Sequence, residues 1–154
     1  MSDPTVPETL EVDRSRWSDL EARAAAMVAL AYAPYSRVHV GAAALVDDGR
    51  IVEGCNVENA STGIGICAEV NLTGALVASG GGRLVALSVL AGDHQPILPC
   101  GRCRQFLYEF GGPDLLIATP RGVVTLGELL PDAFGPAELA ARVDPAPSSG
   151  SVDR

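Results

Sequence analysis

The sequence of 154 residues contains no lysine, so its eleven basic residues are all arginines, against nineteen acidic residues. The formal net charge is −8, and this balance argues against a nucleic-acid partner, which needs a basic patch or stripe. Hydrophobic residues make up 47% of the chain, yet no apolar run approaches the ~18 residues of a membrane-spanning helix. We therefore expect neither a nucleic-acid-binding protein nor a membrane protein.

A secretory signal is also missing, because the first residues, Met1-Ser2-Asp3-Pro4, do not form a basic stretch followed by an apolar one. We therefore expect a cytoplasmic protein whose four cysteines remain reduced. Under those conditions metal binding is a better expectation for clustered cysteines than a disulfide.

The length fits one domain of ordinary size. Residues 1–13 are polar, contain prolines and show no periodicity, so we expect a flexible N-terminal segment. Residues 143–154 are rich in proline and serine and offer too little apolar surface to offset the entropy of ordering. The sequence thus predicts a folded domain over residues 14–142 and a disordered C-terminal tail.

Two short clusters carry the chemistry of the chain: Cys67-Ala68-Glu69, and Cys100 with Cys103 in the segment Pro99-Cys100-Gly101-Arg102-Cys103. Three thiolates leave one position of a tetrahedral zinc ion open, and a catalytic zinc needs that position for water. Glu69 then lies two residues after the first ligand, where it can move protons for that water. This Cys-x-Glu and Pro-Cys-x-x-Cys pattern is the signature of zinc-dependent nucleobase deaminases.

A structural zinc site is the alternative reading, because a closed site takes four ligands and Cys55 is the fourth cysteine. Cys55 lies in an alternating strand pattern, where a lone cysteine usually behaves as a small buried hydrophobe. His39 is a further possible ligand, although it alternates with two valines, and His94 falls in a polar loop. We expect one catalytic zinc per chain, held by Cys67, Cys100 and Cys103.

Hydrophobic periodicity predicts helices and strands in alternation. Two capping boxes are expected at helix starts, one from Ser18 with Glu21 and one from Thr125 with Glu128. The order of elements suggests a mixed sheet covered by helices on both faces. Helices are expected over residues 16–32, from 66 or 67 to 80, over 100–111 and in a short turn before 131, and strands over 38–46, 51–57, 85–91, 115–118 and 123–125.

The chain resembles the small cytidine deaminases over roughly residues 15–139. The matching segments, beyond the two cysteine clusters, are residues 33–37, 40–43, 54–60, 99–105 and 129–135. The resemblance implies a three-layer α/β/α fold with a mixed five-stranded sheet. It also implies hydrolytic deamination of cytidine or 2′-deoxycytidine, with Glu69 as the proton carrier, and a homotetramer whose active sites are shared between subunits.

The same resemblance assigns substrate contacts. Asn56 and Glu58 are expected to hydrogen-bond the ribose 3′-hydroxyl, and the backbone of Ala68 is expected to meet the pyrimidine 2-oxo group. Phe134 is expected to reach the base pocket from a neighbouring subunit. Arg104, beside the cysteine pair, is expected to donate a hydrogen bond to a thiolate and so drain charge from it.

Three positions depart from the family pattern. Val38 and Thr62 stand where the family often has aromatic residues, and Val70 stands where it often has an arginine. The first two departures leave open a deaminase of a modified cytosine nucleoside, of the nucleoside-antibiotic type. A non-catalytic zinc-stabilised binding protein of the same fold is the other alternative, although such a protein has no need of Glu69.

Overall fold

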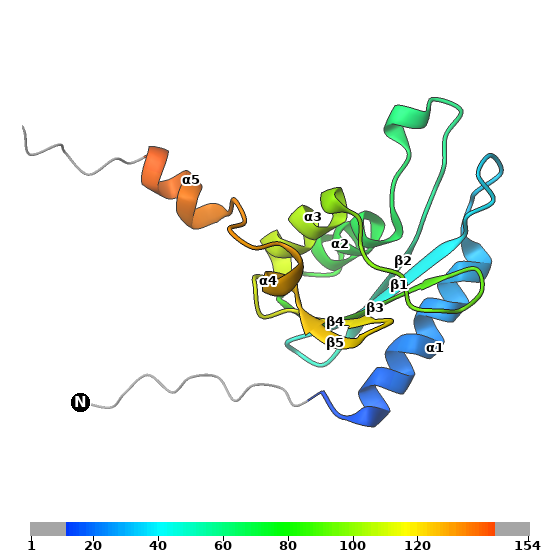
Figure 1. Cartoon of the computed structure of the whole chain (residues 1–154), viewed down its shortest axis with the longest axis horizontal. Helices are drawn as coiled ribbons and strands as arrows, with labels where there is room; N and C mark the ends of the chain where they lie inside the picture. The colour runs from blue at the N-terminus through cyan, green and yellow to red at the C-terminus, as the bar shows by residue number, and fades with distance from the viewer. Residues whose placement is uncertain (1–11, 144–154) are drawn as a thin grey trace, which may run out of the picture.

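The computed structural model describes residues 12–143, which form three layers with one sheet in the middle (Figure 1). Helix α1 covers one face of the sheet, and helices α2 and α3 cover the other. The predicted three-layer α/β/α fold is therefore confirmed. The elements are α1 (Arg14–Leu30), β1 (Val40–Val46), β2 (Ile51–Cys55), the 3₁₀ turn η1 (Thr62–Ile64), α2 (Ala68–Ala78), β3 (Leu84–Ala91), α3 (Gly101–Gly111), β4 (Leu116–Thr119), β5 (Gly122–Thr125), α4 (Leu126–Leu129) and α5 (Pro136–Val143).

The sheet has five strands in the order β2-β1-β3-β4-β5. Strand β1 pairs antiparallel with β2 and with β3, and β5 pairs antiparallel with β4. Strands β3 and β4 are parallel, and helix α3 forms the crossover between them, which makes the sheet mixed as predicted. Strand β1 is buried on both faces, because its residues alternate between the layer of α1 and the layer of α2 and α3.

Helix α1 begins two residues earlier than its predicted start at residue 16, and the expected capping box is wrong. Asp13 is the N-cap, and its carboxylate accepts a hydrogen bond from the Arg16 N–H at 2.9 Å. Ser18 lies inside the helix, where its hydroxyl donates to the Arg14 carbonyl at 3.1 Å. An aspartate at the N-cap satisfies free N–H groups of the first turn, which explains the earlier start.

The buried stripe of α1 consists of Leu20, Ala24 and Val28, at four-residue spacing. This stripe packs on β1 at Gly41, which is a glycine for a physical reason. A Cβ at Gly41 would lie only 2.5 Å from the Val28 nitrogen and would also overlap the Ala24 carbonyl oxygen. The helix backbone therefore rests directly on the strand.

The short helix α4 has the predicted capping box, in which Thr125 and Glu128 exchange hydrogen bonds with each other's backbone N–H. Helix α5 was not expected from the sequence, and it projects away from the sheet layers (Figure 1). Most of the predicted flexible ends lies outside the described residues, although Asp13 caps α1 and Val143 ends α5. Within residues 12–143, no helix has the length and apolar character needed to cross a membrane.

Candidate zinc and active site

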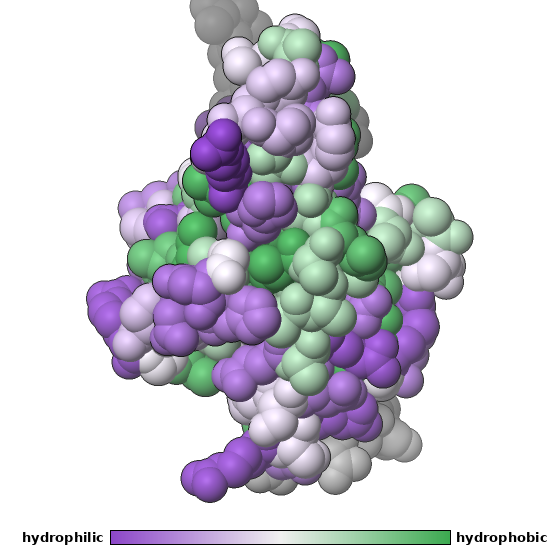
Figure 2. All heavy atoms as spheres, turned by 90° about the vertical axis from the view of Figure 1, so that its right-hand side faces the viewer, coloured by the Kyte–Doolittle hydropathy of each residue, from purple (hydrophilic) through white to green (hydrophobic). Residues whose placement is uncertain are grey.

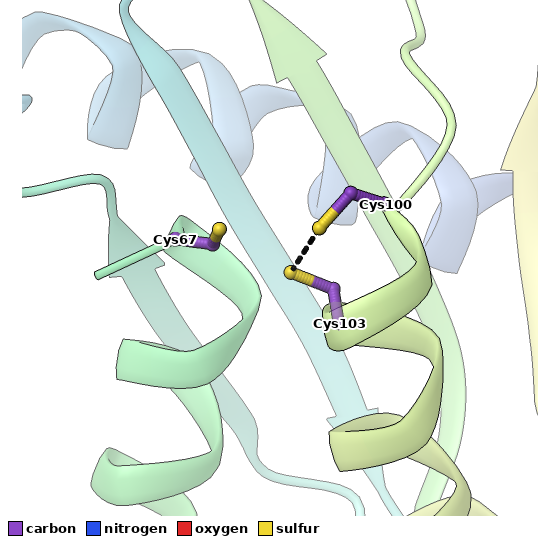
Figure 3. Close-up of side chains that lie close together, drawn as sticks. All are labelled: Cys67, Cys100 and Cys103. Atoms are coloured by element: carbon purple, nitrogen blue, oxygen red, sulfur yellow. Dashed lines mark hydrogen bonds between the residues drawn. The ribbon is translucent and has the colours of Figure 1, made fainter. Parts of the chain in front are cut away.

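Three cysteine side chains meet where the N-termini of α2 and α3 converge (Figure 3). Cys67 is the N-cap residue of α2, Cys100 is the N-cap residue of α3, and Cys103 lies in the first turn of α3. All three sulfurs lie within 4.8 Å of one another, and the Cys100 and Cys103 sulfurs are 3.5 Å apart. The sequence thus placed Cys67 and Cys100 one position too far into their helices, yet it predicted the cluster.

The donor set fits zinc. Thiolates bind Zn²⁺ at about 2.3 Å, so tetrahedral ligands are about 3.8 Å apart, close to the observed spacing of the sulfurs. Cys55 is not part of the cluster, and neither histidine is, so the described residues offer three ligands and not four. This arrangement matches an open catalytic site better than a closed structural one.

The electrostatics of the three thiols are uneven. Burial raises the pKa of Cys67, and burial together with the nearby Glu69 carboxylate raises the pKa of Cys103 well above its usual range. Burial also opposes ionisation of Cys100, but the Cys103 backbone N–H and the two neighbouring thiols outweigh it and lower the pKa of Cys100. Cys100 is therefore the easiest of the three thiols to ionise, and zinc binding must displace the protons that the thiols still carry.

Glu69 lies in the first turn of α2 and is only 4% exposed. Burial raises the pKa of its carboxyl above the usual value. A general acid–base group works best when its pKa approaches the operating pH, so burial tunes this carboxyl in the direction that proton transfer needs. An ordinary solvated helix-start glutamate would be exposed, and Glu69 is not.

A cavity of about 150 Å³ connects these groups. The three cysteines, Glu69, Ala68 and Asn56 all line it. The sequence did not single out the four apolar residues that complete its wall: Val40, Val89, Ile97 and Leu98. Val40 and Val89 lie on the adjacent strands β1 and β3, and Ile97 donates its N–H to the Val89 carbonyl at 3.0 Å, so only the tertiary fold brings the four together.

Asn56 directly follows β2, and both ends of its side-chain amide are bonded to the chain segment that enters β1. Its Oδ1 accepts from the Val40 N–H at 2.8 Å, and its Nδ2 donates to the Val38 carbonyl at 2.8 Å. These bonds fix the orientation of the amide at the cavity wall.

Glu58 does not line this cavity, although it lies on the same segment after β2. Its carboxylate accepts hydrogen bonds from the backbone N–H groups of Tyr35 and Ser36 and from the Ser36 hydroxyl. The Ser36 hydroxyl is the main cause that lowers the pKa of Glu58, which therefore carries a negative charge at neutral pH. The carboxylate holds the segment before β1 in place.

The expected hydrogen bond from Arg104 to a thiolate is absent from the described residues. Its Nε donates to the Pro99 carbonyl at 2.8 Å, and its Nη1 donates to the Leu129 carbonyl at 2.7 Å. Leu129 ends α4, and carbonyls at helix ends lack partners within the helix, which explains why the guanidinium binds there. Arg104 thus braces the residue before Cys100 and does not contact a sulfur.

Val38, Thr62 and Phe134 are all exposed, and none of them lines the cavity of a single chain. Figure 2 shows apolar residues gathered in the middle of the face that carries the loops before β1 and after β2. Exposed apolar side chains in those loops include Tyr35, Val38 and Ile64. The structure therefore places the predicted departures Val38 and Thr62 on an outer face.

The comparisons with known proteins agree with this geometry. Residues 15–119 match the family model described as the cytidine and deoxycytidylate deaminase zinc-binding region. The chain is 56% identical over 119 residues to a cytidine deaminase from Mycobacterium tuberculosis, covering 77% of this chain and 90% of that protein. A cytidine deaminase from Halalkalibacterium halodurans is 41% identical over 109 residues, covering 68% of this chain and 83% of that protein.

Solved structures show the same fold. The crystal structure of cytidine deaminase from Mycobacterium tuberculosis aligns with a TM-score of 0.76 at 56% sequence identity, covering 77% of this chain and 97% of that chain. The cytidine deaminase from Burkholderia pseudomallei aligns with a TM-score of 0.70 at 43% identity, covering 76% and 98%. The chain therefore belongs to the zinc-dependent cytidine and deoxycytidylate deaminase family.

Proposed function

We propose that the chain catalyses the hydrolytic deamination of cytidine and 2′-deoxycytidine to uridine and 2′-deoxyuridine, with release of ammonia. The observation that carries this function is the buried Glu69 carboxylate in the same cavity as the three thiols. The family match and the cytidine deaminase relatives support the same reaction. The cavity of about 150 Å³ is large enough to admit one pyrimidine ring.

Zinc, held by Cys67, Cys100 and Cys103, supplies the Lewis acidity that makes a water molecule acidic enough to react near neutral pH. Glu69 accepts the proton of the attacking water as the oxygen bonds to C4 of the cytosine. Glu69 then gives that proton to N3. It next takes the proton of the hydroxyl now on C4 and delivers it to the amino group, so that the C4–N bond breaks, ammonia leaves and the C4 carbonyl forms. One buried carboxyl thus serves every proton transfer.

The substrate contacts belong to the same proposal. Asn56 and Glu58 bind the ribose 3′-hydroxyl, and the backbone of Ala68 binds the 2-oxo group of the base. The fixed amide of Asn56 at the cavity wall supports its assignment. Arg104 contributes by bracing the Pro99 carbonyl, and so the approach of Cys100 to the metal.

We further propose a homotetramer in which Phe134 of one subunit closes the base pocket of another. Phe134 is 54% exposed and lies outside the cavity of its own chain, which leaves it free to do so. The net charge of −8 without lysine supports a nucleoside substrate over nucleic acid. The three free thiols of the zinc site are compatible with a cytoplasmic protein, because the cytoplasm is reducing. All the site residues lie within the domain proposed for residues 14–142.

The decisive experiment measures uridine and ammonia formed from cytidine, 2′-deoxycytidine and a cytosine-bearing nucleoside antibiotic by the purified zinc-loaded protein. We expect uridine and ammonia in equal amounts, loss of activity on chelation and recovery on adding zinc. A zinc-loaded, folded protein that deaminates neither natural nucleoside would contradict the proposal. Activity on the antibiotic alone would favour the modified-nucleoside alternative, which neither the relatives nor the cavity favours.

A further inference from the structure

Deamination of a nucleoside requires the residue that binds the ribose to lie at a fixed distance from the residues that act on the base. Asn56, assigned to the ribose, follows strand β2, whereas Cys67 and Glu69, which act at the base, lie at the start of helix α2. These two elements are connected through the exposed loop that contains η1, and two backbone hydrogen bonds of 2.9 Å between Val57 and Ile66 join the ends of that loop. This bridge holds the loop ends together, and contacts between β2 and α2 set the position of the helix itself on the strand.

The first contact is the direct packing of α2 on Gly54. A Cβ at this position would lie 2.5 Å from the Ala68 carbonyl oxygen and 2.6 Å from the Leu72 nitrogen. The first turn of α2 therefore rests on the strand backbone with no side chain between them. This contact sets the height of α2 above β2, but it does not stop the helix from sliding along the strand.

The second contact is directional. The Asn71 side-chain Nδ2 donates a partly buried hydrogen bond of 2.7 Å to the carbonyl oxygen of Cys55. Strand β2 is an edge of the sheet, and Asn71 supplies this carbonyl with a partner. Cys55 immediately precedes Asn56, and Asn71 lies two residues after Glu69. This hydrogen bond thus joins a residue beside the ribose contact Asn56 to a residue close to the proton carrier Glu69.

We propose that Asn71 is a positioning residue, whose bond to the Cys55 carbonyl holds the ribose contact Asn56 in register with Glu69. The proposal rests on the proposed function, because it concerns how that reaction uses the ribose. The contact with the 3′-hydroxyl then does more than hold the nucleoside, because it also aligns C4 of the base with Glu69 and the zinc site. A helix that slides by a fraction of an ångström loses this alignment while zinc stays bound.

The test compares kcat/KM for cytidine and for 3′-deoxycytidine in the parent protein and in two variants. Asn71→Ala removes the donor, and Asn71→Asp keeps the shape but cannot donate to a carbonyl when ionised. Misplacement of reacting groups by about 1 Å can cost as much as 10²-fold, so we expect a loss of about tenfold with cytidine. The loss with 3′-deoxycytidine should be much smaller, since that nucleoside lacks the anchoring hydroxyl.

Thr73→Val is the matched control, because the Thr73 hydroxyl donates to the Val70 carbonyl within α2 and makes no bond to β2. It should leave the ratio between the two nucleosides unchanged, and all variants should retain zinc. Equal losses for both nucleosides in the Asn71 variants, or no loss, would overturn the inference. So would a parent protein that does not distinguish the two nucleosides. A parent protein inactive on cytidine would instead contradict the proposed function.

Discussion

Helices α1 and α2 pack on opposite faces of the sheet by the same device, yet their N-termini are built differently. Each rests on a strand glycine, Gly41 beneath α1 and Gly54 beneath α2. The N-terminus of α1 is closed by Asp13, whose carboxylate binds the backbone N–H of Arg16. The N-cap residue of α2 is Cys67, whose side chain makes no cap hydrogen bond.

Helix α3 also begins with a cysteine, because its N-cap residue is Cys100, whose thiol is not a regular side-chain cap although, despite burial, the Cys103 backbone N–H acts on it and lowers its pKa. The partial positive charge at these two helix N-termini offsets part of the cost of burying thiolates at the zinc site. The comparison teaches that the N-terminus of α1, on one face of the sheet, is capped in a way that stabilises the helix. On the other face, the N-termini of α2 and α3 carry the cysteines that bind zinc.

The largest effect should come from removing a zinc ligand. Cys100→Ala leaves only two thiolates, so we expect most of the zinc and essentially all of the activity to be lost. Cys55→Ser should retain both, because Cys55 lies outside the sulfur cluster. Metal content per chain, measured on the purified proteins, checks both variants. Equal zinc loss in the two variants would support a closed four-ligand site instead.

Glu69→Gln should give the next largest effect. General acid–base groups typically contribute ~10²–10⁴-fold to the rate, and this carboxyl serves several proton transfers, so we expect a loss of kcat at the upper end of that range. Glutamine keeps the shape of the side chain, and the folded protein should therefore still bind zinc. Turnover within a few-fold of the parent protein would rule out Glu69 as the proton carrier.

The two glycines offer a direct test of the two faces. Gly41→Ala and Gly54→Ala should each lower the free energy of unfolding by about 1–3 kcal/mol, since both force a helix away from its strand. Only Gly54→Ala should also lower kcat/KM, because α2 carries Glu69 and α1 carries no site residue. Denaturant unfolding and steady-state kinetics under folded conditions measure the two effects. Equal kcat/KM in both variants would mean that the height of α2 does not matter for catalysis.

Local patterns in the sequence were enough to predict the chemistry. Cys67 and Glu69 are two residues apart, and Cys100 and Cys103 are three residues apart. The Thr125–Glu128 capping box spans four residues. The alternation of apolar residues also predicted the order of elements and the mixed sheet. Such features depend on neighbours in the sequence, which a pattern can record.

Features that depend on tertiary contacts were missed. Asn71 bonds to a residue sixteen positions away, and Arg104 bonds to the Leu129 carbonyl twenty-five positions away. The apolar wall of the cavity joins residues from two strands and a loop. Nothing in the local sequence around Gly54 says that a helix backbone lies on it. The cap at Asp13 was missed for another reason, because Ser18 and Glu21 offered a competing local pattern.

The smallest effect should come from the cap of α1. The Ser15 hydroxyl and the Arg16 backbone N–H hold the pKa of Asp13 below its usual value of 3.8. A carboxyl whose pKa is lowered by folding stabilises the folded state above its unfolded pKa, and that contribution is lost as the pH falls through the folded pKa. Asp13→Ala should therefore lower the melting temperature slightly at pH 7, and the difference should shrink below about pH 3.8. Asp13→Asn, which can still cap a helix, is the control and should remain close to the parent protein at pH 7. Neither variant should change kcat/KM, since α1 lies on the face without chemistry. A drop in kcat/KM would show that the two faces of the sheet are coupled.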